Sequence, residues 1–169
     1  MKYVVVAIIL AVIVGGYLTM FMIATAAHDP ADWHHDPLTI PASETPNDYR
    51  IAPPDLTEQK IDRDAPIYSA RPLVVAQAFD QFALSQRDTV RIAGLPPELM
   101  MTYVQHTETL KMPDYISVKF IDLGNDTSTI AIYSRSRFGY GDLGVNKERV
   151  ERWIKALSSF EQSATTVEN

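Results

Sequence analysis

The chain has 169 residues, a formal net charge of −6 and no cysteine. This length accommodates one domain of ordinary size beside a short N-terminal segment. An acidic chain lacks the concentrated cationic surface that phosphate backbones require, so we expect no nucleic-acid partner. The absence of cysteine excludes disulfides, a thiol nucleophile and thiolate-bound metals.

An uncharged, apolar run occupies residues 3–27. As an α-helix it would extend about 37 Å, which exceeds the roughly 30 Å hydrocarbon core of a bilayer. We therefore predict a transmembrane anchor over residues 1–27. A cleavable signal peptide is the alternative, because Lys2 supplies a basic start and residues 24–26 resemble a small-residue cleavage site. The run is longer than a usual signal core, which favours the anchor.

The charges that flank this run predict its orientation. Lys2 precedes it, whereas residues 28–37 contain three aspartates and no lysine or arginine. Because basic flanks stay in the cytoplasm, we expect a single-pass membrane protein with a cytoplasmic N-terminus and its domain on the periplasmic or extracytoplasmic side. Trp33 lies just beyond the run, where an indole ring favours the headgroup layer.

Residues 28–45 are predicted to be a proline-rich tether to a domain over residues 46–160. The tether carries six side chains of metal-ligand type, but their spacing fits no standard zinc pattern. We therefore interpret it as a solvated juxtamembrane segment and expect no metal site. These six residues are His28, Asp29, Asp32, His34, His35 and Asp36.

The first half of the domain predicts one helix and two strands. A helix is expected from Ser69 to Gln86, because apolar residues such as Val75 and Phe79 recur at helical spacing. A strand over 88–94 follows and ends at a proline-containing break. A second strand is expected over 101–110.

The second half predicts a β-hairpin and a final helix. Residues 115–123 and 127–137 alternate in polarity on either side of a Gly-Asn-Asp turn. An amphipathic helix follows, with its apolar residues spaced by three and four, and residues 161–169 are expected to be a frayed tail. The fold class is therefore α+β, with an antiparallel sheet of about four strands flanked by two helices on its apolar face.

Residues 139–144 match G-x-G-x-x-G, a pattern typical of dinucleotide sites. That motif opens a parallel βαβ unit, whereas here only one helix follows it. We therefore expect the glycines to form a strand-to-helix turn, with Asp142 or Asn146 capping the helix, and we predict no cofactor. No nucleophile has a general base within the predicted layout, so no catalytic residue is assigned.

Strand alternation puts Arg135 and Arg137 on the sheet face opposite Ile130 and Ile132. The hairpin register adds polar and aromatic residues to the arginine face, namely Tyr115, Ser117, Lys119 and Tyr133. This surface leads to a helix N-terminus, which attracts anions, so a phosphate, a carboxylate or an anionic lipid is one candidate ligand. The alternative, which we favour, is that both arginines pair with Asp142, Asp122 or Glu151 and hold the turn.

Residues 134–149, SRSRFGYGDLGVNKER, resemble a known family pattern. The pattern is roughly S-x-S-R-x-G-x-x-D-x-G-x-N-x-x-R, and it belongs to the domain-of-unknown-function family numbered 1499. Residues 46–49, 52–54 and 113–115 also resemble segments of this family. The resemblance implies one domain from about Pro46 to Phe160, and it implies no activity. Some members carry a cysteine near the first of these segments, and no such role transfers to this chain.

The resemblance also implies that the polar residues of the motif form the family's characteristic cluster. Our first hypothesis is a membrane-anchored envelope protein whose domain binds a ligand or has a structural role. The second is an envelope hydrolase, in which Arg135, Arg137, Asp142 and Arg149 converge on one cleft. The candidate binding residues are Arg135, Arg137, Tyr140, Asp142, Asn146 and Arg149.

Overall fold

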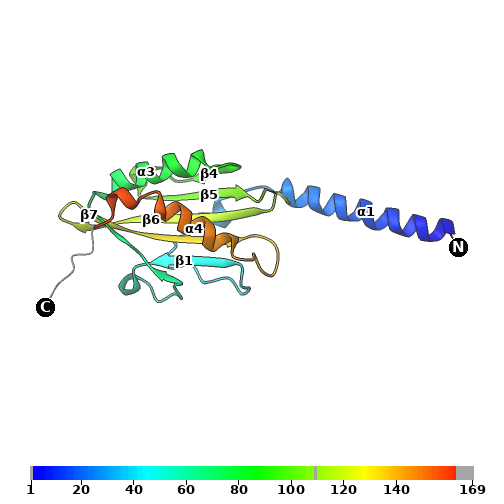
Figure 1. Ribbon diagram of the computed structural model, residues 1–169, viewed down its shortest axis with the longest axis horizontal. Helices are drawn as coiled ribbons and strands as arrows, with labels where there is room; N and C mark the ends of the chain where they lie inside the picture. The colour runs from blue at the N-terminus through cyan, green and yellow to red at the C-terminus, as the bar shows by residue number, and fades with distance from the viewer. Residues whose placement is uncertain (1, 109, 163–169) are drawn as a thin grey trace.

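The computed structural model describes residues 2–108 and 110–162 and shows an α+β fold with a mixed, mostly antiparallel sheet of seven strands (Figure 1). The strands are β1 (Asp48–Ala52), β2 (Arg63–Asp64), β3 (Ile67–Tyr68), β4 (Thr89–Ala93), β5 (Met100–His106), β6 (Pro113–Gly124) and β7 (Thr127–Ser136). The α-helices are α1 (Lys2–Ala24), α2 (Pro30–Trp33), α3 (Pro72–Ser85) and α4 (Val145–Lys155). Single 3₁₀ turns are η1 (Pro54–Leu56), η2 (Pro96–Glu98) and η3 (Ser158–Phe160).

Helix α1 projects from one end of the sheet and lies outside the core (Figure 1). Its segment Lys2–Ile23 has a mean hydropathy of 2.6, and none of it is buried. The predicted apolar N-terminal helix is therefore confirmed. It is long and apolar enough to span a membrane, and an N-terminal signal sequence would meet the same criteria.

The sheet has three more strands than the sequence predicted. Strands β4 to β7 are the four expected ones, and the order across the sheet is β2-β1-β7-β6-β5-β4. Strand β1 runs antiparallel to β7 and parallel to β2, while β3 pairs with another part of β7. The additional strands are short, so their conformation is set by pairing and not by local pattern: β1 and β3 add to the long edge of β7, and β2 adds to β1.

Both α3 and α4 pack on the apolar face of the sheet, as predicted. Phe79 of α3 meets Trp153 of α4 edge to face, with ring centroids 5.6 Å apart. Beneath them lie alternate residues of the central strands, among them Ile116 and Ile132, which are fully buried. This packing leaves the opposite face of the sheet to be covered by something else.

Residues 28–45, which we call the strap, cover that opposite face. The Trp33 ring stacks on Tyr115 with centroids 3.5 Å apart, and His34 Nδ1 lies 2.9 Å from Thr102 Oγ1. Asp36 forms an ion pair with Lys119. The prediction of a solvated tether is therefore wrong, and Trp33 contacts protein where a lipid-headgroup contact was expected. The sheet offers the strap an aromatic surface and hydrogen-bond partners that local sequence does not reveal.

The expected tail begins within ordered structure. Glu161 forms a bridge with Tyr68 of β3, and the Gln162 N–H donates to the Ile67 carbonyl over 3.0 Å. The rest of the predicted tail, residues 163–169, lies outside the described residues.

Candidate functional site

The helix-covered face of the sheet turns from apolar to polar at the end where α1 projects. Gln105, Asp114 and Ser134 occupy this end on the neighbouring strands β5, β6 and β7. Each lies two residues from a buried apolar residue of the same face, as Asp114 does from Ile116. A buried carboxylate at such a position requires a partner, because an unpaired buried charge is very costly.

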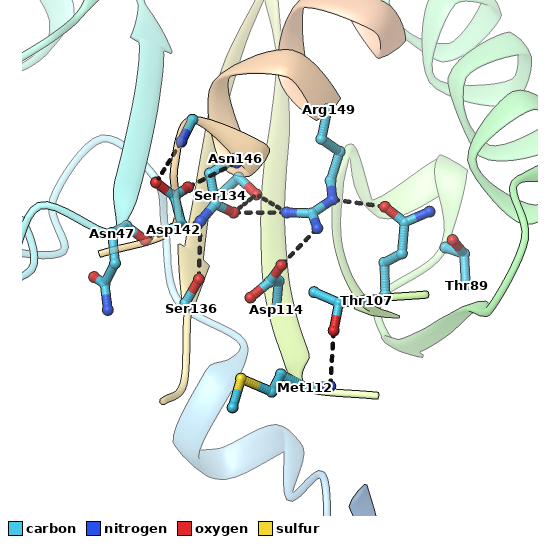
Figure 2. Close-up of polar contacts among 12 residues, drawn as sticks. Asn47, Thr89, Thr107, Met112, Asp114, Ser134, Ser136, Asp142, Asn146 and Arg149 are labelled. Atoms are coloured by element: carbon cyan, nitrogen blue, oxygen red, sulfur yellow. Dashed lines mark hydrogen bonds and ion pairs between the residues drawn. The ribbon is translucent and has the colours of Figure 1, made fainter. Parts of the chain in front are cut away.

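Helix α4 supplies that partner (Figure 2). The buried Arg149 guanidinium donates from Nη2 to Asp114 Oδ2 and from Nε to Gln105 Oε1, each over 2.6 Å. Its Nη1 donates to Asn146 Oδ1 over 2.6 Å and to Ser134 Oγ over 3.1 Å. Arg149 therefore joins α4 to β5, β6 and β7, and its charge and four of its five N–H donors are used within the protein.

Asn146, one helical turn before Arg149, extends the network to the start of β1. Its Nδ2 donates to the Asn47 carbonyl over 2.9 Å and to Ser136 Oγ over 3.1 Å. Its Oδ1 also accepts the Ser134 hydroxyl over 2.6 Å. This buried amide thus holds together α4, β7 and the segment that enters β1.

The N-cap position of α4 is Gly144, and the Asp142 side chain, two residues earlier, accepts N–H groups at the start of the helix. This agrees with the capping role predicted for Asp142 and not with the one predicted for Asn146. Asp142 Oδ1 accepts the Gly144 N–H over 3.0 Å and its Oδ2 accepts the Asn146 N–H over 2.7 Å. Gly139 and Gly144 have φ of 94° and 85°, a region that favours glycine, so the tight turn needs both. The helix N-terminus already has a carboxylate on its N–H groups, which removes the reason to expect an external anion there.

Arg135 lies on the other sheet face, beneath the strap. Its Nη2 donates to the Trp33 carbonyl over 3.0 Å, and its Nη1 donates to Ser117 Oγ over 3.3 Å. The predicted face, with Tyr133 and Ser117 beside Arg135, is confirmed, but it is buried and not an open surface. The pKa of Arg135 is lowered to about 10, mainly by burial; Tyr133 opposes this shift, and the neighbouring Arg50 guanidinium adds to it.

Arg137 closes the same face near α1. Its Nη1 donates to the Ala27 carbonyl over 2.8 Å and to the Tyr115 hydroxyl over 3.2 Å. Within residues 2–108 and 110–162, neither Arg135 nor Arg137 pairs with a carboxylate, so the predicted ion pairs are wrong. Their expected partners have other roles: Asp142 caps α4, Asp122 accepts the Gly124 N–H, and Glu151 binds Arg63 and Tyr49.

The sheet itself therefore separates the arginines of the motif. Arg149 and Asp142 lie on the helix side, whereas Arg135 and Arg137 lie on the strap side. The predicted convergence of these four residues on one cleft is wrong. Strand alternation is the reason. It turns Ser134 and Ser136 towards α4, and it turns Arg135 and Arg137 towards the other face.

A cleft of about 780 Å³ opens above the Arg149 network. Arg149 and Asp114 form part of its floor, and its walls include apolar side chains from two loops. The loop after β5 contributes Leu110 and Met112, and the turn before α4 contributes Phe138, Leu143 and Val145. The predicted site residue Tyr140 belongs to the same turn but does not line the cleft, and its side chain is 77% exposed.

The cleft lies at the end of the domain that meets α1. Three contacts fix the start of the strap to this end: Arg137 binds the Ala27 carbonyl, His28 Nδ1 lies 2.7 Å from the Tyr115 hydroxyl, and the His28 ring packs 5.2 Å from the ring of His106. Burial lowers the pKa of His28, and the charges of His106 and Arg137 lower it further. The neutral imidazole is thus favoured at this junction.

Sequence reasoning missed three partners of the network, Asn47, Gln105 and Asp114. One signal could have identified Asp114. The strand was predicted over 115–123, one residue after Asp114. Continued back by that residue, its alternation puts Asp114 on the face of Ile116 and Val118, which a helix was expected to cover. Gln105 and the backbone of Asn47 carry no comparable signal.

Comparison with known proteins places this network within a family. No curated protein matches the chain. The family profile of DUF1499, described as a protein of unknown function, matches residues 38–157, which is more than half of the chain. The matched range includes every residue of the network, from Asn47 to Arg149. The chain therefore belongs to the DUF1499 family.

Proposed function

We propose that this protein is a single-pass membrane protein whose domain binds an amphiphilic molecule in the cleft beside its anchor. In this proposal α1 is retained as the anchor, the N-terminus is cytoplasmic and the domain lies on the periplasmic or extracytoplasmic side. The charge distribution supports this orientation. Lys2 lies at the start of the helix, and the titratable residues in 25–37 are all aspartates or histidines, with no lysine or arginine.

The chemistry of the cleft supports an amphiphile over a free phosphate. The floor cation, Arg149, is neutralised by Asp114, and four of its five N–H donors are bonded within the protein. A free anion would therefore find no available cation at the floor. Apolar wall residues such as Met112, Phe138 and Val145 instead favour the hydrocarbon part of a ligand.

The edge of the cleft suits the polar part of such a molecule. Arg152 lines the cleft one turn after Glu148, is exposed, and forms no ion pair within the described part of the chain. A lipid headgroup at the edge could bind this guanidinium while the hydrocarbon lies against the walls. The observation that carries the proposal is thus a cleft of mixed lining at the end where the anchor emerges. Apolar side chains from two loops lie beside polar and charged ones, and the charge of Arg149 is neutralised by Asp114.

The orientation has a direct test. A phosphatase reporter that is active only after export, fused behind Asn169, is expected to be active in cells that produce the full chain. The same fusion on a variant without residues 2–24 should be inactive, because nothing would then direct the domain across the bilayer. Activity confined to a cytosolic reporter at the same position would refute the orientation.

The cleft has a separate test. The full-length protein, extracted in mild detergent, is expected to retain an amphiphile that native mass spectrometry detects. Val145→Trp should lower its occupancy at least about tenfold, because the indole would occupy the space of the hydrocarbon. Leu123→Trp is the matched control, since Leu123 is similarly exposed but lies at the opposite end of β6.

Two results would refute cleft binding. One is a wild-type protein that retains no amphiphile in detergent or in vesicles of zwitterionic or anionic lipid. The other is equal occupancy in Val145→Trp and Leu123→Trp.

A further inference from the structure

Exposed apolar side chains gather around the cleft at the α1 end of the domain. Leu110 is 48% exposed, Tyr140 77% and Val145 38%, and Leu143 is fully exposed. We call these four residues the apolar rim. Leu110, Leu143 and Val145 line the cleft, and Tyr140 lies in the turn beside it. Scattered exposed leucines are normal on protein surfaces, but an exposed apolar group beside one cleft is typical of an interaction surface.

The backbone at Leu143 strengthens this interpretation. Leu143 has φ of 54°, in the left-handed backbone region that residues other than glycine, asparagine and aspartate rarely adopt. Its side chain is fully exposed at the edge of the cleft and takes no part in the core. A strained position that presents a large apolar side chain to solvent indicates a contact outside the domain.

The start of the strap fixes how far this end can lie from the bilayer. Helix α1 has 23 residues and extends about 34 Å, slightly more than the roughly 30 Å hydrocarbon core. After Ala24 only residues 25–27 precede His28, which contacts Tyr115 and His106. The four steps from Ala24 to His28 span at most about 14 Å. The headgroup layer adds roughly 5–8 Å on each side of the core, so this end of the domain lies at the lipid surface.

We propose that the apolar rim inserts into the headgroup layer of the membrane that α1 spans. The occupant of this surface is the bilayer itself, because α1 leaves the domain at the end where the loop after β5 and the turn before α4 carry the rim (Figure 1). The inference rests on the anchor of the proposed function, but not on binding of an amphiphile in the cleft. If both hold, the cleft opens directly onto lipid, and its ligand can enter from the membrane without crossing water.

The absence of cysteine allows a precise test in the full chain. Single-cysteine variants Leu143→Cys and Tyr140→Cys, labelled with an environment-sensitive fluorophore, are reconstituted in vesicles that contain lipids with a quencher near the headgroup. Rim labels are expected to be quenched at least about threefold more than a Leu123→Cys label, because inserted side chains reach roughly 5–10 Å into the boundary. Leu123 lies at the far end of β6 and serves as the control.

A further single-cysteine variant, Val12→Cys in α1, is labelled in the same way and tested with a quencher on the lipid acyl chain. It shows whether α1 spans the bilayer, independently of whether the rim inserts. If the Val12 label is quenched and the rim labels behave like the Leu123 label, insertion of the rim is refuted while the anchor stands. If the Val12 label is not quenched, both the membrane anchor and the insertion of the rim are refuted. Retention of an amphiphile is measured independently, so neither result decides whether the cleft is occupied.

Discussion

Replacement of Arg149 by methionine is expected to lower the free energy of unfolding by about 3–5 kcal/mol. The reason is that the Asp114 carboxylate, whose side chain is only 3% exposed, would lose its counter-ion and remain buried. Gln105 and Asn146 would each lose a hydrogen-bond donor as well. Urea denaturation of the detergent-solubilised protein, followed by tryptophan fluorescence, measures this change.

Two further variants show whether the buried ion pair is the cause. Arg152→Met removes an exposed arginine one turn further along α4, and it should change stability by less than about 0.5 kcal/mol. Combining Arg149→Met with Asp114→Asn should recover part of the loss, because no carboxylate then remains buried without a cation. Equal stability of Arg149→Met and the wild type would show that the network does not hold α4 to the sheet.

The same network shows how far the sequence could lead. The motif indicated a cluster, and Asp142, Asn146 and Arg149 do lie together. Arg135 and Arg137 are close in sequence to that cluster, yet their side chains lie on the opposite face of the sheet, where they bond Trp33 and Ala27. Alternation already placed both on the face opposite Ile130 and Ile132, and a helix packed on those isoleucines could not contact them. Strand alternation thus predicted the faces of the two arginines correctly. Only the structure shows which face α4 covers, and therefore that Arg149 and the two arginines lie on opposite sides of the sheet.

Strands with a strong local pattern were predictable, and strands formed by pairing alone were not. The hairpin of β6 and β7 has long alternation and a turn sequence of its own, so it appears within one residue or two of its predicted bounds. Strand β1 has only five residues and is flanked by prolines, while β2 and β3 have two residues each. Segments this short carry no periodicity, and their conformation is set by the strands beside them.

The strap was the largest error, and its cause is similar. Its prolines correctly indicated the absence of long regular helix, and composition then suggested solvated chain. Its binding to the sheet depends on contacts such as Trp33 with Tyr115 and His34 with Thr102, which are separated by more than 60 residues in sequence. Local pattern cannot reveal such pairs.

Trp33→Ala is expected to release the first part of the strap while the sheet stays folded. The substitution removes a stacked ring pair and the aromatic surface that lies 5.3 Å from the Arg135 guanidinium carbon. Because Trp33 is only half-buried, the cost of about 2 kcal/mol is smaller than for a core tryptophan. Hydrogen exchange of the backbone amides of residues 32–35 should therefore accelerate about 30-fold in the full-length protein.

Amides of β6 and β7 serve as the internal reference, since their exchange should change far less than that of the strap. Trp33→Phe is the matched variant, because a phenyl ring retains part of the stacking on Tyr115 and should show an intermediate acceleration. Unchanged exchange in Trp33→Ala would mean that polar contacts alone, such as the Arg135 bond to the Trp33 carbonyl, hold the strap. Since the strap connects α1 to the domain, its release should also allow the apolar rim to leave the bilayer, and quenching of the Leu143→Cys label should fall with it.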